Sequence, residues 1–100
     1  MKRVINGKRY DTDTATRIAE YSYLYPSDFR YIDEALYIKR TGEYFLAGKG
    51  GAMSKYSKPC GDNSYSGGSD IFPLSDAMAR EWVETHANDQ YEEIFGPAPE

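Results

Sequence analysis

The chain has 100 residues, a formal net charge of −4 and a single cysteine. This length allows one domain with one modest core, expected to span residues 1–100, and excludes a catalytic cleft between two domains. The lone Cys60 excludes an internal disulfide and is typical of the reducing cytoplasm. The N-terminal run MKRVINGKRY has no apolar core and uncharged stretches such as Tyr21–Ser27 are short, so neither a secretory signal nor a membrane span is expected.

The N-terminal third predicts a hairpin followed by a helix. Asn6-Gly7 separates two strand-like runs, Lys2–Ile5 and Lys8–Tyr10, and this dipeptide supplies the two positive φ angles of a type I′ turn. Residues 11–14 offer several helix caps, and Ala15, Ile18 and Ala19 recur at helical spacing, which predicts a short helix over 15–21.

The middle of the chain predicts a second hairpin. The aromatic and branched run Phe29–Lys39 is typical of a strand, and Tyr44–Ala47 of its returning partner. A two-residue loop at Thr41-Gly42 would pair Arg40 with Glu43, Ile38 with Phe45 and Leu36 with Ala47. Residues 48–70 are rich in glycine and serine and predict a long loop, of a kind that is usually functional or mobile.

The C-terminal third predicts an edge strand and a helix. Pro73 restricts the strand Ile71–Leu74 to a sheet edge or a strand end. Ser75 caps a helix over Asp76–His86, and a further turn over 89–95 stops at Gly96 and Pro97. We therefore expect an α+β fold: a twisted antiparallel sheet of about four strands, a short N-terminal helix, and a C-terminal helix packed on one face. Met78 and Trp82 should anchor that helix on Ile38, Phe45 and Leu46.

Nothing in the sequence forms a recognisable catalytic or cofactor motif. Gly48-Lys49-Gly50-Gly51 follows a strand but matches neither the phosphate-loop nor the dinucleotide-binding pattern. Cys60 and His86 are too few for a structural zinc site, and no residue nearby orients His86 as a triad requires. We expect no enzyme activity, no metal and no cofactor.

Charge is distributed unevenly, and each sign suggests a different partner. Residues 51–100 carry nine Asp/Glu against three Lys/Arg, and an acidic face of this kind attracts basic protein surfaces. Its expected residues are Glu81, Glu84, Asp89, Tyr91, Glu92 and Glu93. The alternative is a nucleic-acid face on the first hairpin, made of Lys2, Arg3, Lys8 and Arg9 with tyrosines interleaved.

A resemblance covers nearly the whole chain. Its longest segment is Val4–Ala15, and the others are Ser27–Arg30, Glu34–Tyr37, Thr41–Leu46, Gly50-Gly51 with Ser54 and Tyr56, and Ile71–Ser75 leading to Trp82. These stretches resemble a family of small proteins from bacterial phages, plasmids and integrative elements that includes anti-CRISPR proteins. The resemblance implies an inhibitor that binds a CRISPR–Cas effector in the bacterial cytoplasm, and it carries over no individual functional residue.

The resemblance implies a target for the acidic face. CRISPR effectors hold guide and target in long, positively charged channels, which an acidic helix edged by Tyr91 could occupy in place of nucleic acid. The alternative is a small nucleic-acid-binding accessory protein of a mobile element, which would use the basic hairpin. The sequence leaves the effector and the oligomeric state open.

Overall fold

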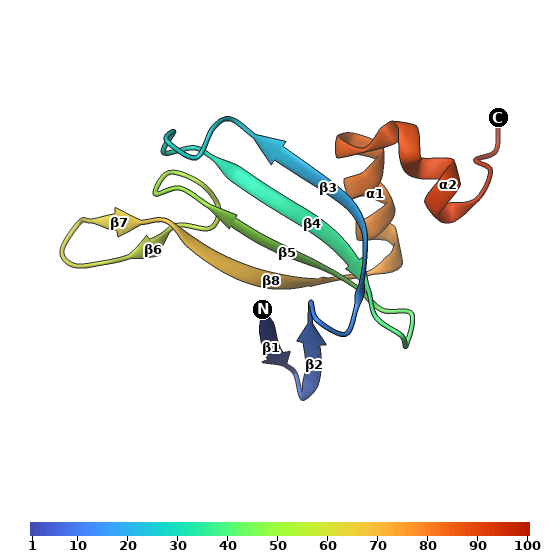
Figure 1. Ribbon diagram of the computed structural model, residues 1–100, viewed down its shortest axis with the longest axis horizontal. Helices are drawn as coiled ribbons and strands as arrows, with labels where there is room; N and C mark the ends of the chain where they lie inside the picture. The colour runs from blue at the N-terminus through green and yellow to red at the C-terminus, as the bar shows by residue number, and fades with distance from the viewer.

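The computed structural model describes all 100 residues and has an α+β architecture. Two small hairpins and a pair of C-terminal helices surround one larger antiparallel sheet (Figure 1). The elements in chain order are β1 (Lys2–Ile5), β2 (Lys8–Asp11), β3 (Thr16–Tyr23), β4 (Ile32–Ile38), β5 (Tyr44–Gly50), β6 (Lys58–Pro59), β7 (Tyr65–Ser66), β8 (Gly68–Leu74), α1 (Asp76–His86), a 3₁₀ turn (Asn88–Gln90) and α2 (Tyr91–Phe95).

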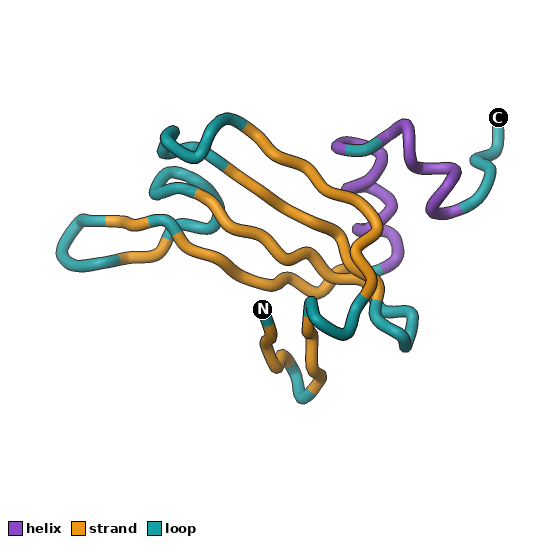
Figure 2. Tube along the Cα trace, viewed as in Figure 1, coloured by secondary structure: helices purple, strands orange, loops and turns teal.

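The four long strands form a sheet in the order β3-β4-β5-β8, with every neighbouring pair antiparallel. The first hairpin, β1–β2, makes a separate two-stranded sheet. Asn6 and Gly7 both have positive φ, at 52° and 76°, so the expected Asn-Gly turn is confirmed. Figure 2 shows the helices and the β4–β5 loop at one end of the long sheet, and the β3–β4 turn and the loop after β5 at the other.

The two faces of the sheet bury different apolar clusters. On one face α1 packs through Ala79, Trp82 and Val83 against Leu36 and Leu46. On the opposite face the hairpin brings Tyr10 onto Phe45, Ala47 and Ile71, with the Tyr10 and Phe45 rings edge to face at 5.5 Å. Successive residues of a strand point to opposite faces, which is why Phe45 and Leu46 belong to different clusters.

This division corrects the expected anchoring of the C-terminal helix. Trp82 and Leu46 do meet beneath α1, but Phe45 lies on the other face of the sheet. Met78 remains 52% exposed and is not an anchor. Ile38 lies farther along the helix-covered face, beside Tyr44 and Ile94.

The expected helix over 15–21 is wrong, because this segment is strand β3. A β-bulge between Arg17 and Ala19 leaves Ile18 without a partner in β4. A bulge interrupts the alternation by which successive side chains of a strand point to opposite faces, so Ile18 and Ala19 both reach the cluster beneath α1. Two adjacent apolar residues that both point inward resemble a helical pattern in the sequence, but this segment is a strand because it pairs with β4.

The expected register of the β4–β5 hairpin is wrong by one residue. Leu36 pairs with Leu46, and Ile38 pairs with Tyr44. The connecting loop has three residues rather than two, because the Lys39 N–H donates to the Glu43 carbonyl and Gly42 adopts a φ of 90°. A left-handed glycine in third position is the usual solution for a three-residue hairpin loop.

The glycine-rich segment 48–70 is more ordered than a long loop. Its first three residues extend β5 to Gly50, its last three begin β8, and β6 and β7 pair within it as a small hairpin. Strand β8 lies at the edge of the sheet, as Pro73 predicted. The helix bounds are also confirmed: the Ser75 hydroxyl accepts from the Met78 N–H at the start of α1, and the chain leaves α2 through Gly96.

Candidate functional site

The C-terminal helices form an acidic pole. Between Glu81 and Glu100 the chain has six carboxylate side chains and no Lys or Arg. Five of them are exposed and lie on α1, the 3₁₀ turn or α2, and none of these takes part in an ion pair: Glu81, Glu84, Asp89, Glu92 and Glu93. We call these five residues the acidic pole.

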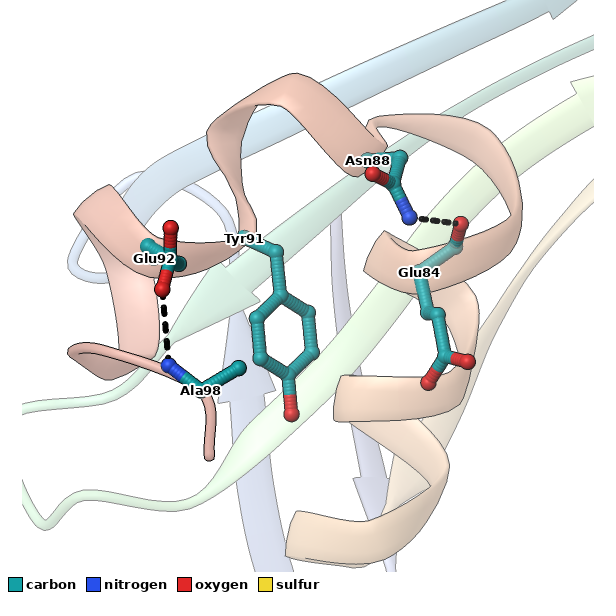
Figure 3. Close-up of a pocket in the computed structure, with 5 residues that line it drawn as sticks. All are labelled: Glu84, Asn88, Tyr91, Glu92 and Ala98. Carbon is teal, nitrogen blue, oxygen red and sulfur yellow. Dashed lines mark hydrogen bonds between the residues drawn. The ribbon is translucent and has the colours of Figure 1, made fainter. Parts of the chain in front are cut away.

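Part of the acidic pole surrounds an open depression of about 430 Å³ between α1, α2 and the C-terminal tail. Glu84, Tyr91 and Glu92 line it, together with Asn88 and Ala98 (Figure 3). The Asn88 side chain donates to the Glu84 carbonyl at 3.0 Å, and the Ala98 N–H donates to Glu92 Oε2 at 2.8 Å. These bonds fix the end of α1 and the tail, and they leave the Glu84 carboxylate free.

The other acidic residues do not share this depression. Glu93 faces a separate hollow with Ile18 and Tyr44, and Glu81 lies on the rim of a groove beside Met78 and Trp82. The six predicted residues are therefore neighbours at one end of the molecule, but they do not form a single flat face.

Arg80 is the one cation of residues 76–100, and its position leaves the acidic pole unneutralised. It pairs with Asp76 at 2.7 Å, one turn earlier on α1, and its guanidinium lies 4.7 Å from the centre of the Phe95 ring. The neighbouring Tyr91 hydroxyl and Asp76 carboxylate raise the pKa of Arg80 above its ordinary value. Arg80 thus joins α1 to α2 without contacting the five carboxylates of the pole.

The basic hairpin is divided between two sides. Cross-strand partners share a side, so Arg3 and Lys8 lie on the side of the buried Tyr10, whereas Lys2 and Arg9 face away. Arg3 and Lys8 are also paired with carboxylates outside the hairpin, Arg3 with Asp70 of β8, and Lys8 with Glu43 just before β5 at 3.2 Å. Two of the four predicted nucleic-acid contacts are thus occupied inside the molecule, and the four side chains form no common surface.

A buried carboxylate, Glu34, is the polar centre that the sequence reasoning missed. Its side chain is 2% exposed and lies beneath α1. Tyr56 donates its hydroxyl to Glu34 Oε2 at 2.6 Å, Trp82 Nε1 donates to Oε1 at 3.2 Å, and the Lys55 ammonium completes the set. The signal was present in strand β4, where Glu34 occupies the same face as the buried Leu36.

The environment of Glu34 keeps it ionised. Burial by itself raises the pKa of its carboxyl, but hydrogen bonds from Lys55, Tyr56 and Trp82 outweigh that effect and hold the pKa below its ordinary value. Burial and the adjacent carboxylate together raise the pKa of Tyr56 far above its ordinary value, so Tyr56 stays a donor. No buried polar side-chain atom in the molecule lacks a partner, and the cluster ties strand β4, the loop after β5 and helix α1 together.

The remaining candidates lie apart. Cys60 is exposed in the β6–β7 hairpin, whereas His86 ends α1 at the opposite end of the sheet and stacks on Tyr21 at 4.0 Å (Figure 1). Gly48 belongs to strand β5 and is covered by the Tyr56 ring, so no phosphate cradle forms there. No group of three or more His, Cys, Asp or Glu residues is placed to hold a metal ion.

Comparisons with protein-family models, with curated proteins and with solved structures find no match for this chain. None of its helices is both long enough and apolar enough to cross a membrane.

Proposed function

We propose that this protein is an inhibitor that binds a CRISPR–Cas effector in the cytoplasm of a bacterial host and hinders its nucleic-acid binding or cleavage. The observation that carries the proposal is the acidic pole, whose five exposed carboxylates have no cationic partner in the molecule. Unneutralised carboxylates gathered on a rigid element complement the cationic channels in which such effectors hold guide and target.

The form of the pole suits this role. Elsewhere in the chain carboxylates such as Asp28, Glu43 and Asp70 are paired with nearby Lys or Arg. Those of the acidic pole are left free on short helices that pack on the sheet through the cluster around Trp82. A fixed array of negative charges beside Tyr91 would attract a basic channel over distance and would then compete with nucleic-acid phosphates for it.

The test is a binding assay against a panel of purified effector complexes, with and without guide RNA. The informative variant reverses Glu84, Asp89 and Glu93 to Lys, because the side chains of these three residues make no hydrogen bond or ion pair whose loss would disturb the fold. A matched control reverses three exposed acids outside the pole, Asp13, Glu20 and Asp62, and changes the net charge equally; of the three only Glu20 has a partner, the exposed Arg17 at 3.4 Å.

We expect the pole variant to bind its effector at least tenfold more weakly, with slower association and a flatter dependence on salt. Both variants should melt close to the parent, since exposed charges contribute little to folding. Equal binding by the pole variant and the parent would refute the acidic mechanism. Loss of activity on reversing Lys2 and Arg9, the two hairpin cations without an ion pair, to Glu, with the pole variant unaffected, would favour a nucleic-acid-binding accessory protein instead.

A further inference from the structure

One face of the long sheet is only partly covered. Helix α1 packs on one end of this face, and the loop after β5 lies at the other end (Figure 1). Lys55 and Tyr56 of that loop reach Glu34 on the same face. An open groove of about 610 Å³ remains between the helix and Lys55. The strand residues that line it are all apolar: Leu46, Phe72 and Leu74.

The wall that α1 contributes to this groove is one continuous stripe of the helix. Its residues are Met78, Glu81, Trp82, Thr85 and His86. They are spaced at i, i+3, i+4, i+7 and i+8, so they follow one side of α1 for about 12 Å. A groove of this length beside a helix matches about two turns of a second helix, which would insert side chains at the same spacing.

The groove is held open by contacts within the chain. Trp82 Nε1 donates to Glu34 Oε1 at 3.2 Å, and Lys55 is bound to the same carboxylate. These bonds fix the two sides of the groove without help from a partner. Met78 differs, because it belongs to neither apolar cluster and is 52% exposed. A fixed apolar floor beside an exposed methionine is typical of protein–protein interfaces.

Strand β8 borders the groove, but its free edge is closed to an added strand. Every second residue of an edge strand turns its N–H outward. On β8 the Ile71 N–H donates to the Asp70 side chain at 2.8 Å, and Pro73, the next residue in this series, has no N–H. Arg3 and Lys58 hold the Asp70 side chain in place. The occupant must therefore satisfy its own backbone hydrogen bonds, as a helix does.

The groove carries one uncompensated charge, and that charge is negative. Lys55 is neutralised by Glu34, and His86, neutral at pH 7, stacks on Tyr21. Glu81 is exposed at the rim and takes part in no ion pair. Charge complementarity thus requires a Lys or Arg on the occupant at the rim, next to the apolar side chains that fill the floor.

We propose that this groove binds a cationic amphipathic helix of a partner protein. Apolar residues of that helix at i, i+3 or i+4, and i+7 contact Phe72 and Met78, and a flanking Lys or Arg pairs with Glu81. As a contact with a CRISPR effector, this inference rests on the proposed function. Glu81 belongs to both the acidic pole and the groove, so the groove adds an apolar anchor beside the surface that attracts a basic partner.

The first test uses the three methionines as reporters. Protein labelled with ¹³C in its methionine methyl groups reports separately on Met1, Met53 and Met78, whose side chains are all exposed. The probe is a synthetic helix of about 18 residues made of Leu, Ala and Lys, with Leu at the anchor positions. We expect the peptide to shift the Met78 signal and to leave the other two unchanged. The same peptide with Glu in place of Lys should shift none of them.

Glu81→Lys should weaken binding of the Lys peptide by at least about tenfold, because like charges would then meet at the rim. Asp62→Lys is the matched control: it changes the net charge equally at an exposed site far from α1, and it should bind the peptide as the parent does. Circular dichroism should find both variants folded. An unchanged Met78 signal, equal shifts of Met53 and Met78, or undiminished binding by Glu81→Lys would overturn the inference.

The second test separates the groove from the rest of the acidic pole. With an effector that binds the parent, Met78→Ala should weaken binding by at least about tenfold, and Met53→Ala, which truncates the same side chain in the loop after β5, should not. Equal binding by Met78→Ala and the parent would overturn the inference and leave the proposed function standing. If no effector binds the parent, the proposed function fails, and the methyl signals still decide for or against the groove.

Discussion

Removing one hydroxyl group from the buried Glu34 cluster should measure what that cluster contributes to folding. Tyr56→Phe keeps the ring over Gly48 and deletes only the donor that reaches Glu34 Oε2 at 2.6 Å. A hydrogen bond to a charged acceptor contributes about 1.5–3 kcal/mol, and Lys55 and Trp82 remain to hold the carboxylate. For a domain of this size that loss lowers the melting temperature by about 6–24 °C.

The free energy of unfolding that Tyr56→Phe loses relative to the parent should depend on pH in a definite direction. The folded state lowers the pKa of Glu34 from its ordinary 4.5, so the stability contributed by its ionised form is present above that value and is lost as the pH falls through the folded value. Tyr56→Phe removes one of the hydrogen bonds that lower this pKa. The difference in free energy of unfolding between parent and variant should therefore be largest at neutral pH and should shrink below pH 4.5.

Urea unfolding followed by the fluorescence of Trp82, the only tryptophan, is the appropriate assay. Tyr25→Phe is the matched control, since it deletes the same hydroxyl from a residue that is 80% exposed, and it should change the free energy of unfolding by less than about 0.5 kcal/mol. Equal effects of the two substitutions, or a Tyr56→Phe deficit that stays constant into the acid range, would refute the role assigned to Glu34.

Three further substitutions test the packing. Trp82→Ala should lower the free energy of unfolding, measured by far-UV circular dichroism, by about 3–5 kcal/mol, whereas Met78→Ala should leave it nearly unchanged. Similar losses in the two variants would contradict the assignment of Trp82 as the anchor of α1. Gly48→Ala places a Cβ 2.2 Å from the Tyr56 hydroxyl and should lower the free energy of unfolding by about 1–3 kcal/mol. If the same loss occurs in a Tyr56→Ala background, Tyr56 is not the group with which the new Cβ collides. Ser75→Ala removes the cap of α1 and should cost about 1 kcal/mol in urea unfolding; no loss would mean that the cap is dispensable.

Local chemistry accounts for the elements that the sequence predicted correctly. Asn6-Gly7 specifies its own turn, because both residues tolerate the positive φ that a two-residue hairpin needs. Ser75 likewise begins α1 by accepting from the Met78 N–H three residues on. Signals of this kind act within a few residues, so they can be read without knowing what the rest of the chain does.

Long-range pairing decided what the sequence predicted wrongly. Ile18 and Ala19 are adjacent and both turn inward, and only the bulge against β4 makes that compatible with a strand. The β4–β5 register differs by one residue because Gly42 adopts a left-handed conformation in a three-residue loop. That single shift places Leu36 opposite Leu46 beneath α1 and leaves Phe45 to the hairpin on the other face.

The sequence by itself determined the α+β class, the first turn, the bounds of α1 and the gathering of acidic residues at the C-terminal end, since each follows from neighbouring residues or from composition. Only the tertiary structure decided the surroundings of Glu34, whose partners Tyr56 and Trp82 lie 22 and 48 residues away in the chain. It also placed the acidic pole at the end of the sheet opposite the β6–β7 hairpin (Figure 1). Contacts between distant segments depend on strand order and register, which no local pattern encodes.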